Sequence, residues 1–361
     1  MKVLMIARKT LNTSPGGDTI QINSTAEYLR YLGIDVDIYI GDVAIDYSTY
    51  DIMHFFNIIR PDDILPHILK SKLPFVVSTI FVDYSEYERN RGGGLGLLAN
   101  IFNSDKIEYI KAIARFLKNG DAINSKFYLL NGHRASIKYV ANKASLLLPN
   151  SHSEYNRFVN KYHTATPYLK IPNAINNLTF STSTCLNENF KNHVLSVGRI
   201  EGRKNQLNLI KALKGTNLFL TIIGKPSPNH MGYYEECVRL IEENDNMQII
   251  DHIDHKELAS IFKAAKVHVL PSWFETTGLS SLEAAIMGCN IVVTPKGDTE
   301  EYFSDLAYYC QPDDILSIKN AVLKAYNEPN KDSLKQLILK NYVWEQTAEQ
   351  TLKAYNTVLN K

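Results

Sequence analysis

Two acidic residues stand eight positions apart in the stretch FETTGLSSLEAAIMG, residues 274–288. Glu275 precedes two threonines and a glycine, where a helix is predicted to begin, and Glu283 falls in its second turn. Free N–H groups at a helix N-terminus attract phosphate, and carboxylates accept hydrogen bonds from vicinal hydroxyls. The stretch therefore indicates a phosphate site between two acids, at the N–H groups of Gly278, Leu279 and Ser280.

The alternative makes Glu275 an ordinary surface acid and Glu283 a capping or solvated residue. Glu283 stands among Ala, Leu, Ile and Met on a helix that is predicted to pack on both sides. Charged residues are seldom fully buried unless they are paired, so this alternative is disfavoured.

A second loop, VGRIEGRKNQ at residues 197–206, carries three cations between a predicted strand and a predicted helix. Arg199 offers a fork of donors and Lys204 a point charge, with Arg203 between them. Such a pair above a helix N-terminus suits a diphosphate. A solvated basic turn is the alternative, and the position at a strand end favours the diphosphate clamp.

A third loop, RKTLNTSPGGDT at residues 8–19, follows the first predicted strand. Gly16 and Gly17 would allow positive φ and close approach of the backbone to a ligand. A flexible loop closed by an N-cap at Asp18 or Thr19 explains the same residues equally well.

Parallel strands must position these loops, because ligands of open parallel sheets bind beyond the carboxyl ends of strands. Short apolar runs alternate with helical patterns from KVLMIA (2–7) to AYYCQP (307–312). This alternation is typical of parallel sheets with helices on both faces. A polar stretch in the middle divides it, so the prediction is an α/β chain of two doubly wound domains facing a cleft, with boundaries at 1–176, a linker at 177–192, 193–340 and a final helix at 341–361.

Composition limits the class of protein. The 361 residues are 45% hydrophobic and 21% charged, with a net charge of +1, which gives no general case for nucleic acid. The four cysteines are widely spaced and indicate neither disulfides nor zinc. Without a signal peptide or a long apolar run, the cytoplasm is the expected location.

The E-x7-E spacing of Glu275 and Glu283 resembles that of glycosyltransferase family 4, the retaining transferases of GT-B fold. LPSWFETTGLSSLEAAIMGCNIVVT is similar to the family signature, and SVGRIEGRKNQLNLIKAL to its donor-phosphate segment. IPNAIN (171–176) and IIGKP (222–226) resemble two further family motifs. The resemblance covers most of 193–325 well and the N-terminal half only in outline.

The resemblance implies a role for each site residue. Arg199 and Lys204 would hold the donor diphosphate, Glu283 the ribose hydroxyls and Glu275 the hydroxyls of the transferred sugar. The donor-binding set would also include Gly16, Gly17, Gly198, Thr277, Gly278 and Leu279. The N-terminal domain would bind the acceptor, the C-terminal domain the nucleotide sugar, and the final helix would pack back on the N-terminal domain.

One departure concerns the segment after the fourth predicted strand, STIFVDYSEYE at 78–88, which lacks the histidine that family members often carry. Asp83, Tyr84 and Glu86 are the polar groups there, and the first two are acceptor-side candidates. His133 is a third candidate, although a surface position is expected for it. Same-face retaining transfer can use the leaving phosphate oxygen as the base.

No metal or cofactor is expected. The single D-x-D, Asp35 to Asp37, falls at the start of a predicted strand and is interpreted as solvated. The cations of the clamp would then neutralise the diphosphate.

Residues 106–143 carry eight Lys and Arg against Glu108 and Asp121, a local balance of +6, after the apolar GGGLGLLANIF at 92–102. These features suit an anionic membrane or a lipid-diphosphate acceptor met by 92–118. A mobile acceptor loop followed by a solvated helix is the alternative.

The sequence therefore predicts a metal-independent, retaining hexosyltransferase that uses a UDP- or GDP-sugar and a glycan or lipid-linked acceptor, in bacterial surface polysaccharide synthesis at the cytoplasmic face of a membrane. A nucleotide-sugar epimerase of the same fold and a non-catalytic nucleotide- or glycan-binding protein are the alternatives.

Overall fold

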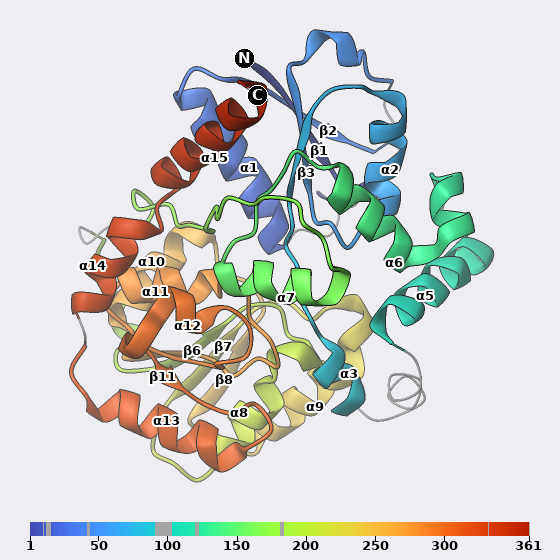
Figure 1. Cartoon of the computed structure of the whole chain (residues 1–361). Coiled ribbons are helices and arrows are strands. Elements are labelled where there is room, and N and C mark those ends of the chain that lie inside the picture. The colour runs from blue at the N-terminus through green and yellow to red at the C-terminus, as the bar shows by residue number, and fades with distance from the viewer. Residues whose placement is uncertain are drawn as a thin grey trace. The chain divides into compact units, whose positions relative to one another are not determined.

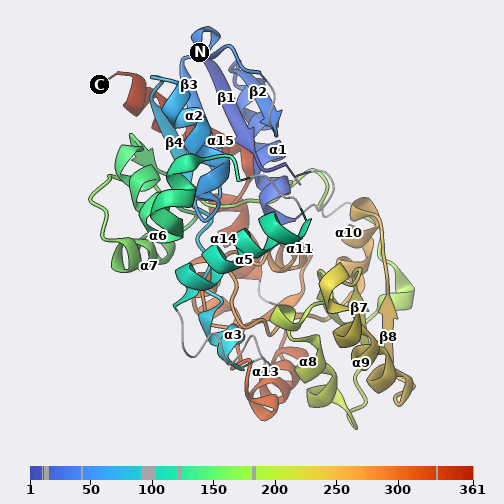
Figure 2. The same cartoon turned by 90° about the vertical axis from the view of Figure 1, so that its right-hand side faces the viewer.

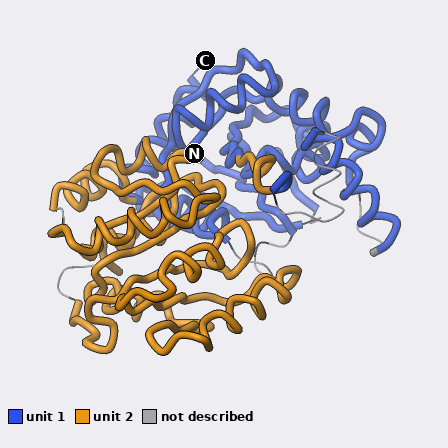
Figure 3. The backbone as a smooth tube through the Cα atoms, turned by 90° about the horizontal axis from the view of Figure 1, so that it is seen from below, with its two compact units in different colours: residues 1–81, 88–173, 344–361 blue, residues 82–87, 174–343 orange. Residues whose placement is uncertain are grey.

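The computed structural model describes residues 1–9, 11, 16–41, 44–90, 103–119, 123–180, 184–330 and 332–360. The chain divides into two compact units, shown in Figure 3. Unit 1 consists of Met1–Phe81, Glu88–Asn173 and Trp344–Lys361. Unit 2 consists of Val82–Tyr87 and Ala174–Val343.

Unit 1 contains a parallel five-stranded sheet in the order β2-β1-β3-β4-β5 (Figure 2). Apolar side chains from both faces of β1 and β3 are buried, which explains why these strands are nearly continuous apolar runs in the sequence. Val3 of β1 lies opposite Val36 of β2 and Ile52 of β3. The strands are β1 Lys2–Ala7, β2 Asp35–Ile40, β3 Ile52–Phe56, β4 Phe75–Ser78 and β5 Leu146–Leu147.

The final helix of the chain, α15, belongs to unit 1. α15 packs along α1, and both are visible side by side in Figure 1. The hydroxyl of Tyr355 lies 2.7 Å from Nδ1 of His54 in β3, and Ser78 Oγ lies 2.9 Å from Nε2 of the same ring. The helices of unit 1 are α1 Gly17–Tyr31, α2 Pro61–Lys70, α5 Ser104–Asn119, α6 Lys126–Lys143, α7 His152–Tyr162 and α15 Trp344–Leu359, with a short η1 Tyr47–Thr49.

Unit 2 contains a parallel six-stranded sheet in the order β11-β10-β9-β6-β7-β8. Alternate residues of β6 enter opposite layers: Val194 packs with α8, α9 and α13, and Leu195 packs with α10, α11 and α14. Helices therefore cover both faces, and the doubly wound prediction is confirmed. The strands are β6 Val194–Val197, β7 Leu220–Ile223, β8 Met247–Ile250, β9 Val267–Leu270, β10 Asn290–Val293 and β11 Tyr308–Tyr309.

The helices of unit 2 are α8 Gln206–Leu213, α9 Met231–Glu242, α10 His255–Ala264, α11 Leu279–Ile286, α12 Thr299–Phe303, α13 Ile315–Asn327 and α14 Asp332–Asn341. Short 3-10 turns complete it: η2 Glu188–Phe190, η3 Gly202–Lys204, η4 Pro228–His230 and η5 Ser304–Leu306. α3, Ser85–Asn90, spans the division between the two units.

Two segments lie elsewhere than the sequence predicted. The stretch 177–192 was interpreted as a linker, but its Phe180 is 1% exposed and packs on Phe262 and His255 in unit 2. Residues 82–87 were assigned to the N-terminal domain, but they also belong to unit 2. In both segments aromatic side chains pack against aromatic rings of unit 2.

Candidate functional site

The predicted phosphate loop lies at the carboxyl end of β9, before α11. Gly278 is the N-cap of α11 and has φ 66° and ψ 62°, a left-handed conformation that favours glycine. Ser280 Oγ donates to the carbonyl of Val197 at 2.9 Å, which ties the start of α11 to the end of β6. Thr277 is buried, and within the described residues its Oγ1 has no hydrogen-bond partner. This loop thus combines open helix N–H groups with a hydroxyl that a ligand oxygen could satisfy.

Glu275 is fixed through both its backbone and its carboxylate. Its N–H donates to the carbonyl of Lys296 at 3.0 Å, and its carbonyl accepts from the N–H of Asp298 at 2.9 Å. A Cβ on Gly297 would lie 1.9 Å from that carbonyl, so glycine is required for the close approach. The side chain is 5% exposed, and Oε1 accepts from Ser272 Oγ at 2.8 Å.

Lys204 forms an ion pair with Glu275, which joins the two loops that the sequence singled out. Burial lowers the pKa of Lys204, but the Glu275 carboxylate and its hydrogen bond outweigh burial and leave that pKa above its ordinary value. Trp273 N–H donates to the carbonyl of Arg203 at 3.0 Å, and Asn205 Nδ2 donates to Pro271 at 2.9 Å. One main-chain and one side-chain hydrogen bond therefore join the two loops.

Gly198, in the loop at 197–206, permits two backbone segments to approach closely. Gly198 follows β6 with φ 154°, and its carbonyl would lie 2.0 Å from a Cβ on Gly224. Gly198 therefore lies at the end of β6 as expected, but its contact in the structure is with another glycine of unit 2. The side chain of Arg199 is exposed to solvent, and its charge helps to lower the pKa of Glu201.

Glu283 lies in α11 and is 8% exposed. Its Oε1 is 2.9 Å from Nε2 of His255, and the ring of His255 packs edge-on against Phe180 at 4.9 Å. The hydrogen bond to Glu283 raises the pKa of His255. Sequence reasoning passed over His255, because nothing in its own segment connects α10 with α11.

Asp83 and Tyr84, the acceptor-side candidates, lie in unit 2 together with the loops that are predicted to bind the donor. The guanidinium of Arg203 lies 4.5 Å from the ring centre of Tyr84. Asp83 accepts a hydrogen bond from the N–H of Ser85 at 3.0 Å and so caps the turn that begins α3. The strand before them, β4, belongs to unit 1, and their assignment to the acceptor side stays a prediction.

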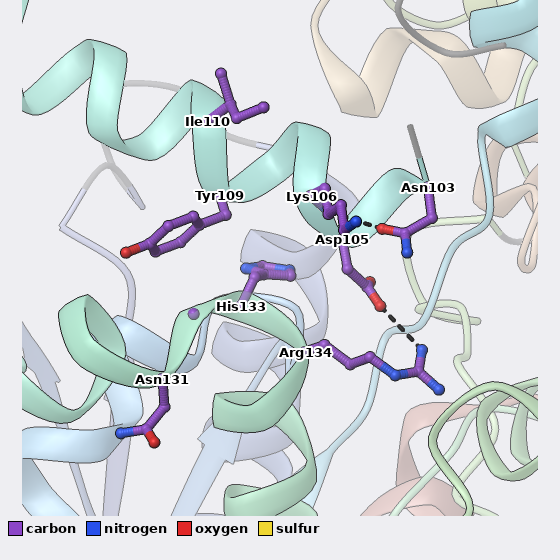
Figure 4. A pocket seen from close by; sticks show the side chains of 9 residues that line it. Asn103, Asp105, Lys106, Tyr109, Ile110, Asn131, His133 and Arg134 are labelled. Carbon is purple, nitrogen blue, oxygen red and sulfur yellow. Dashed lines mark hydrogen bonds and ion pairs between the residues drawn. The ribbon is translucent and has the colours of Figure 1, made fainter. Parts of the chain in front are cut away.

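His133 is buried and not on the surface as expected. Its Nδ1 lies 3.2 Å from the hydroxyl of Tyr128, and burial lowers the pKa of its imidazole. It lines a pocket of about 380 Å³ between α5 and α6, where Gly132 interrupts the helix with φ 76° (Figure 4). Asp105, on the same pocket, pairs with Arg134 at 3.1 Å.

Gly16 and Gly17 lie in unit 1 at the start of α1. Gly16 is the N-cap, with φ −154°, and its N–H donates to Thr19 Oγ1 at 3.0 Å. Asp18 forms an ion pair with Arg8 at 2.6 Å. The N-cap of α1 is therefore Gly16 and neither Asp18 nor Thr19, which the capping alternative named. Residues 10 and 12–15 of the loop lie outside the described residues.

The D-x-D residues lie in β2, where Asp37 accepts from the hydroxyl of Tyr50 at 2.7 Å. Within the described parts of the chain, no group of three or more His, Cys, Asp or Glu residues could hold a metal ion. No helix in the same parts is long and apolar enough to cross a membrane.

A family comparison decides the class of this site. The model described as glycosyl transferases group 1 matches residues 186–343, which include both acids and the cationic loop. All of the matched residues lie in unit 2. This match, together with the relatives and solved structures described below, confirms the predictions of a glycosyltransferase and of a GT-B fold. The roles of the individual site residues and the E-x7-E motif stay predictions.

Curated relatives agree with this assignment. A D-inositol 3-phosphate glycosyltransferase from Pseudarthrobacter chlorophenolicus is 22% identical over 99% of this chain and 96% of its own length. An O-antigen chain mannosyltransferase B from Escherichia coli is 23% identical over 46% of each protein.

Solved structures show the same fold. Sucrose-phosphate synthase from Thermosynechococcus elongatus superposes with a TM-score of 0.77 at 15% identity, covering 99% of both chains. The Anabaena protein HepE, in complex with UDP and glucose, gives a TM-score of 0.69 at 13% identity, over 99% of this chain and 100% of its own.

Proposed function

We propose that this glycosyltransferase is a retaining hexosyltransferase that moves a sugar from a UDP- or GDP-sugar to a hydroxyl of a glycan or lipid-linked saccharide in bacterial surface polysaccharide synthesis. The ion pair between Lys204 and Glu275 at the N-terminus of α11 carries the proposal. In this proposal the cation of the pair holds a diphosphate, and the acid holds hydroxyls of the sugar. The UDP-bound neighbour and the O-antigen mannosyltransferase support the donor class and the pathway.

The donor is proposed to bind along the carboxyl ends of β6 and β9. Lys204, Arg199 and the N–H groups that begin α11 take the diphosphate, and the hydroxyl of Thr277 gains a partner there. Glu283 takes the ribose hydroxyls with the carboxylate oxygen that His255 leaves unused. Glu275 takes the hydroxyls of the transferred sugar.

In the proposed reaction the bond between the anomeric carbon and the diphosphate breaks while the acceptor oxygen approaches from the same face. The proton of the acceptor hydroxyl goes to the leaving phosphate oxygen, so no separate base is required. Lys204 stabilises the negative charge that develops on the leaving group, in a site where Glu275 is already desolvated. Lys204 and Arg199 together neutralise the charge of the diphosphate, as a metal ion would otherwise do.

Nucleotide binding tests the donor site directly. We expect one of UDP, GDP, ADP or CMP to raise the thermal midpoint, because a ligand at about 100 times its Kd stabilises the folded protein by about 2.7 kcal/mol. If none of the four shifted the midpoint at millimolar concentration, the donor site would be wrong.

A turnover assay separates this function from its alternatives. Release of nucleoside diphosphate that depends on an acceptor supports transfer. Turnover without acceptor that inverts a sugar centre would indicate an epimerase, and binding without turnover a non-catalytic protein. The placement of two acids at one donor site favours transfer.

We also propose that α5 contacts an anionic membrane or a lipid-linked acceptor. From Lys106 to Lys118 no side chain of this helix is buried. Its most exposed apolar side chains are Ile110, Phe116 and Leu117, with exposed cations on the same helix. An amphipathic helix of this composition suits the boundary between headgroups and acyl chains. The apolar stretch 92–102, to which the same role was assigned, lies outside the described residues.

A further inference from the structure

Residues 82–87 form a short segment, here called the strap, that leaves the strands of unit 1 and packs on unit 2. Its side chains contact the loops that carry the donor site. The ring of Tyr84 lies 6.0 Å from Phe274, and the ring of Tyr87 lies 6.3 Å from Trp273. Glu86 forms an ion pair with Lys296, beside the backbone that fixes Glu275.

The strap also fits closely against the cationic loop. A Cβ on Gly202 would lie 2.3 Å from the hydroxyl of Tyr87, so the loop carries glycine where the strap touches it. The strap therefore packs against η3, the turn that presents Arg203 and Lys204.

Arg203 is held on two sides. Its Nη2 donates to both oxygens of Glu201 at 3.1 and 3.0 Å, and its guanidinium lies 4.5 Å from the ring centre of Tyr84. Within the described residues, Nε and Nη1 have no hydrogen-bond partner. A planar guanidinium can stack on a ring and still donate in its own plane. Arg203 thus keeps donors for an anionic ligand while its position is fixed.

Tyr84 lies at the centre of the charged groups. Burial raises its pKa, and the charges of Arg203, Lys204, Glu275 and Glu201 all act on it. These are the groups that the proposed function assigns to the diphosphate and the transferred sugar, together with their immediate neighbours.

We propose that Arg203 is a further cation of the donor site, binding the diphosphate beside Lys204, and that Tyr84 of the strap is its positioning residue. The inference rests on the proposed function. It means that a segment taken from between two strands of unit 1 completes the nucleotide site of unit 2, and that donor affinity depends on it.

The test compares a nucleoside diphosphate with its monophosphate by calorimetric titration. UDP and UMP are the probes, replaced by the GDP and GMP or ADP and AMP pair if the nucleotide screen selects that base. We expect Arg203→Gln and Tyr84→Leu each to weaken diphosphate binding about tenfold, the value of one charge-assisted contact, and monophosphate binding less than about twofold.

Three further variants sharpen the result. Tyr84→Phe keeps the ring and should bind as the wild type does. The double variant Arg203→Gln with Tyr84→Leu should be no weaker than either single variant, because both remove the same contact. Tyr31→Leu, at an exposed tyrosine of α1, controls for the substitution itself.

Different outcomes would contradict different parts of the proposal for Arg203 and Tyr84. Equal losses for diphosphate and monophosphate in Arg203→Gln, or no loss, would show that Arg203 does not bind the diphosphate. A loss in Arg203→Gln with none in Tyr84→Leu would remove the strap from the site, and a full loss in Tyr84→Phe would transfer the role from the ring to the hydroxyl. Failure of the wild type to bind any nucleotide would instead refute the proposed function.

Discussion

The Lys204–Glu275 pair shows how the site depends on single residues. The two side chains are brought together from loops that follow β6 and β9, neighbouring strands of the sheet. Glu275 also accepts from Ser272, so its carboxylate keeps a donor when Lys204 turns toward a ligand. Removal of either charge should therefore affect chemistry more than folding.

Replacement of Lys204 tests the clamp. Lys204→Ala should lower kcat about 30- to 1,000-fold, equivalent to roughly 2–4 kcal/mol of transition-state stabilisation, because it removes a cation from the leaving diphosphate. Steady-state kinetics with the cognate donor measure the loss, and the thermal midpoint reports on folding. Lys211→Ala, an exposed lysine of the neighbouring α8, is the matched control. Unchanged turnover in a folded Lys204→Ala protein would exclude Lys204 from the mechanism.

The two acids should differ in their kinetic effects. Glu283→Gln should weaken the binding of donor and of free nucleotide alike and act mainly on KM, since the ribose does not change during the reaction. Glu275→Gln should lower kcat and leave nucleotide binding nearly unchanged, since the transferred sugar gains charge in the transition state. Calorimetric titration beside kinetics measures both. The opposite pattern would reverse the assigned roles.

At the scale of elements, helix termini and exposed faces decide what can bind. α11 begins at a left-handed glycine, and its second residue, Ser280, bonds to the end of β6, so its free N–H groups lie at the carboxyl ends of the strands. α5 has the opposite character, because Asp105 is its one buried residue in the part from Ser104 to Lys118. Asp105 anchors it through Arg134, Lys161 and Tyr162.

The face of α5 yields a membrane prediction. Vesicles rich in anionic lipid should sediment the wild-type protein at low salt, and salt should release it, because the contact is partly electrostatic. Leu117→Glu, at a side chain that is 75% exposed, should abolish sedimentation with no loss of thermal stability.

A matched control is Leu316→Glu, at a leucine of α13 that is 62% exposed. It should leave sedimentation unchanged. Equal sedimentation with neutral and anionic vesicles, or equal effects of the two substitutions, would mean that α5 is merely a solvated helix.

At the scale of the whole molecule, each unit has a neutral histidine in its core. His54 in unit 1 bonds to Tyr355 and Ser78, and His268 in unit 2 bonds to Ser281 Oγ at 3.1 Å. Burial lowers the pKa of each to about 3. Below the ordinary histidine pKa the unfolded chain binds protons on these histidines, whereas the folded chain does not. The free energy of unfolding is therefore highest above that pKa and falls as the pH drops below it.

This coupling predicts acid sensitivity. Between pH 7.5 and 5 the free energy of unfolding should fall by about 2 kcal/mol for each buried histidine. In the His54→Gln variant the free energy of unfolding, measured by urea denaturation, should fall by about 2 kcal/mol less than in the wild type between pH 7.5 and 5. His252→Gln, at a largely exposed histidine, should keep the wild-type slope. An unaltered slope in His54→Gln would show that His54 takes up its proton equally in the folded and the unfolded protein.

The sequence by itself determined the fold class and singled out the two loops of the proposed donor site. Runs such as KVLMIA and VHVLPS are apolar on both faces, and that pattern suits only strands covered by helices on two sides. The loops at 197–206 and 274–283 were identifiable because local spacing places their charges at strand ends.

Tertiary structure alone decided which groups surround those charges. The strap, His255 and the packing of Phe180 join segments far apart in the chain, and no periodicity within one segment encodes a partner in another. His133 was misplaced for the same reason, since α5 covers it. Local pattern fixes the direction of a strand or helix, whereas burial and pairing depend on what the rest of the chain packs against it.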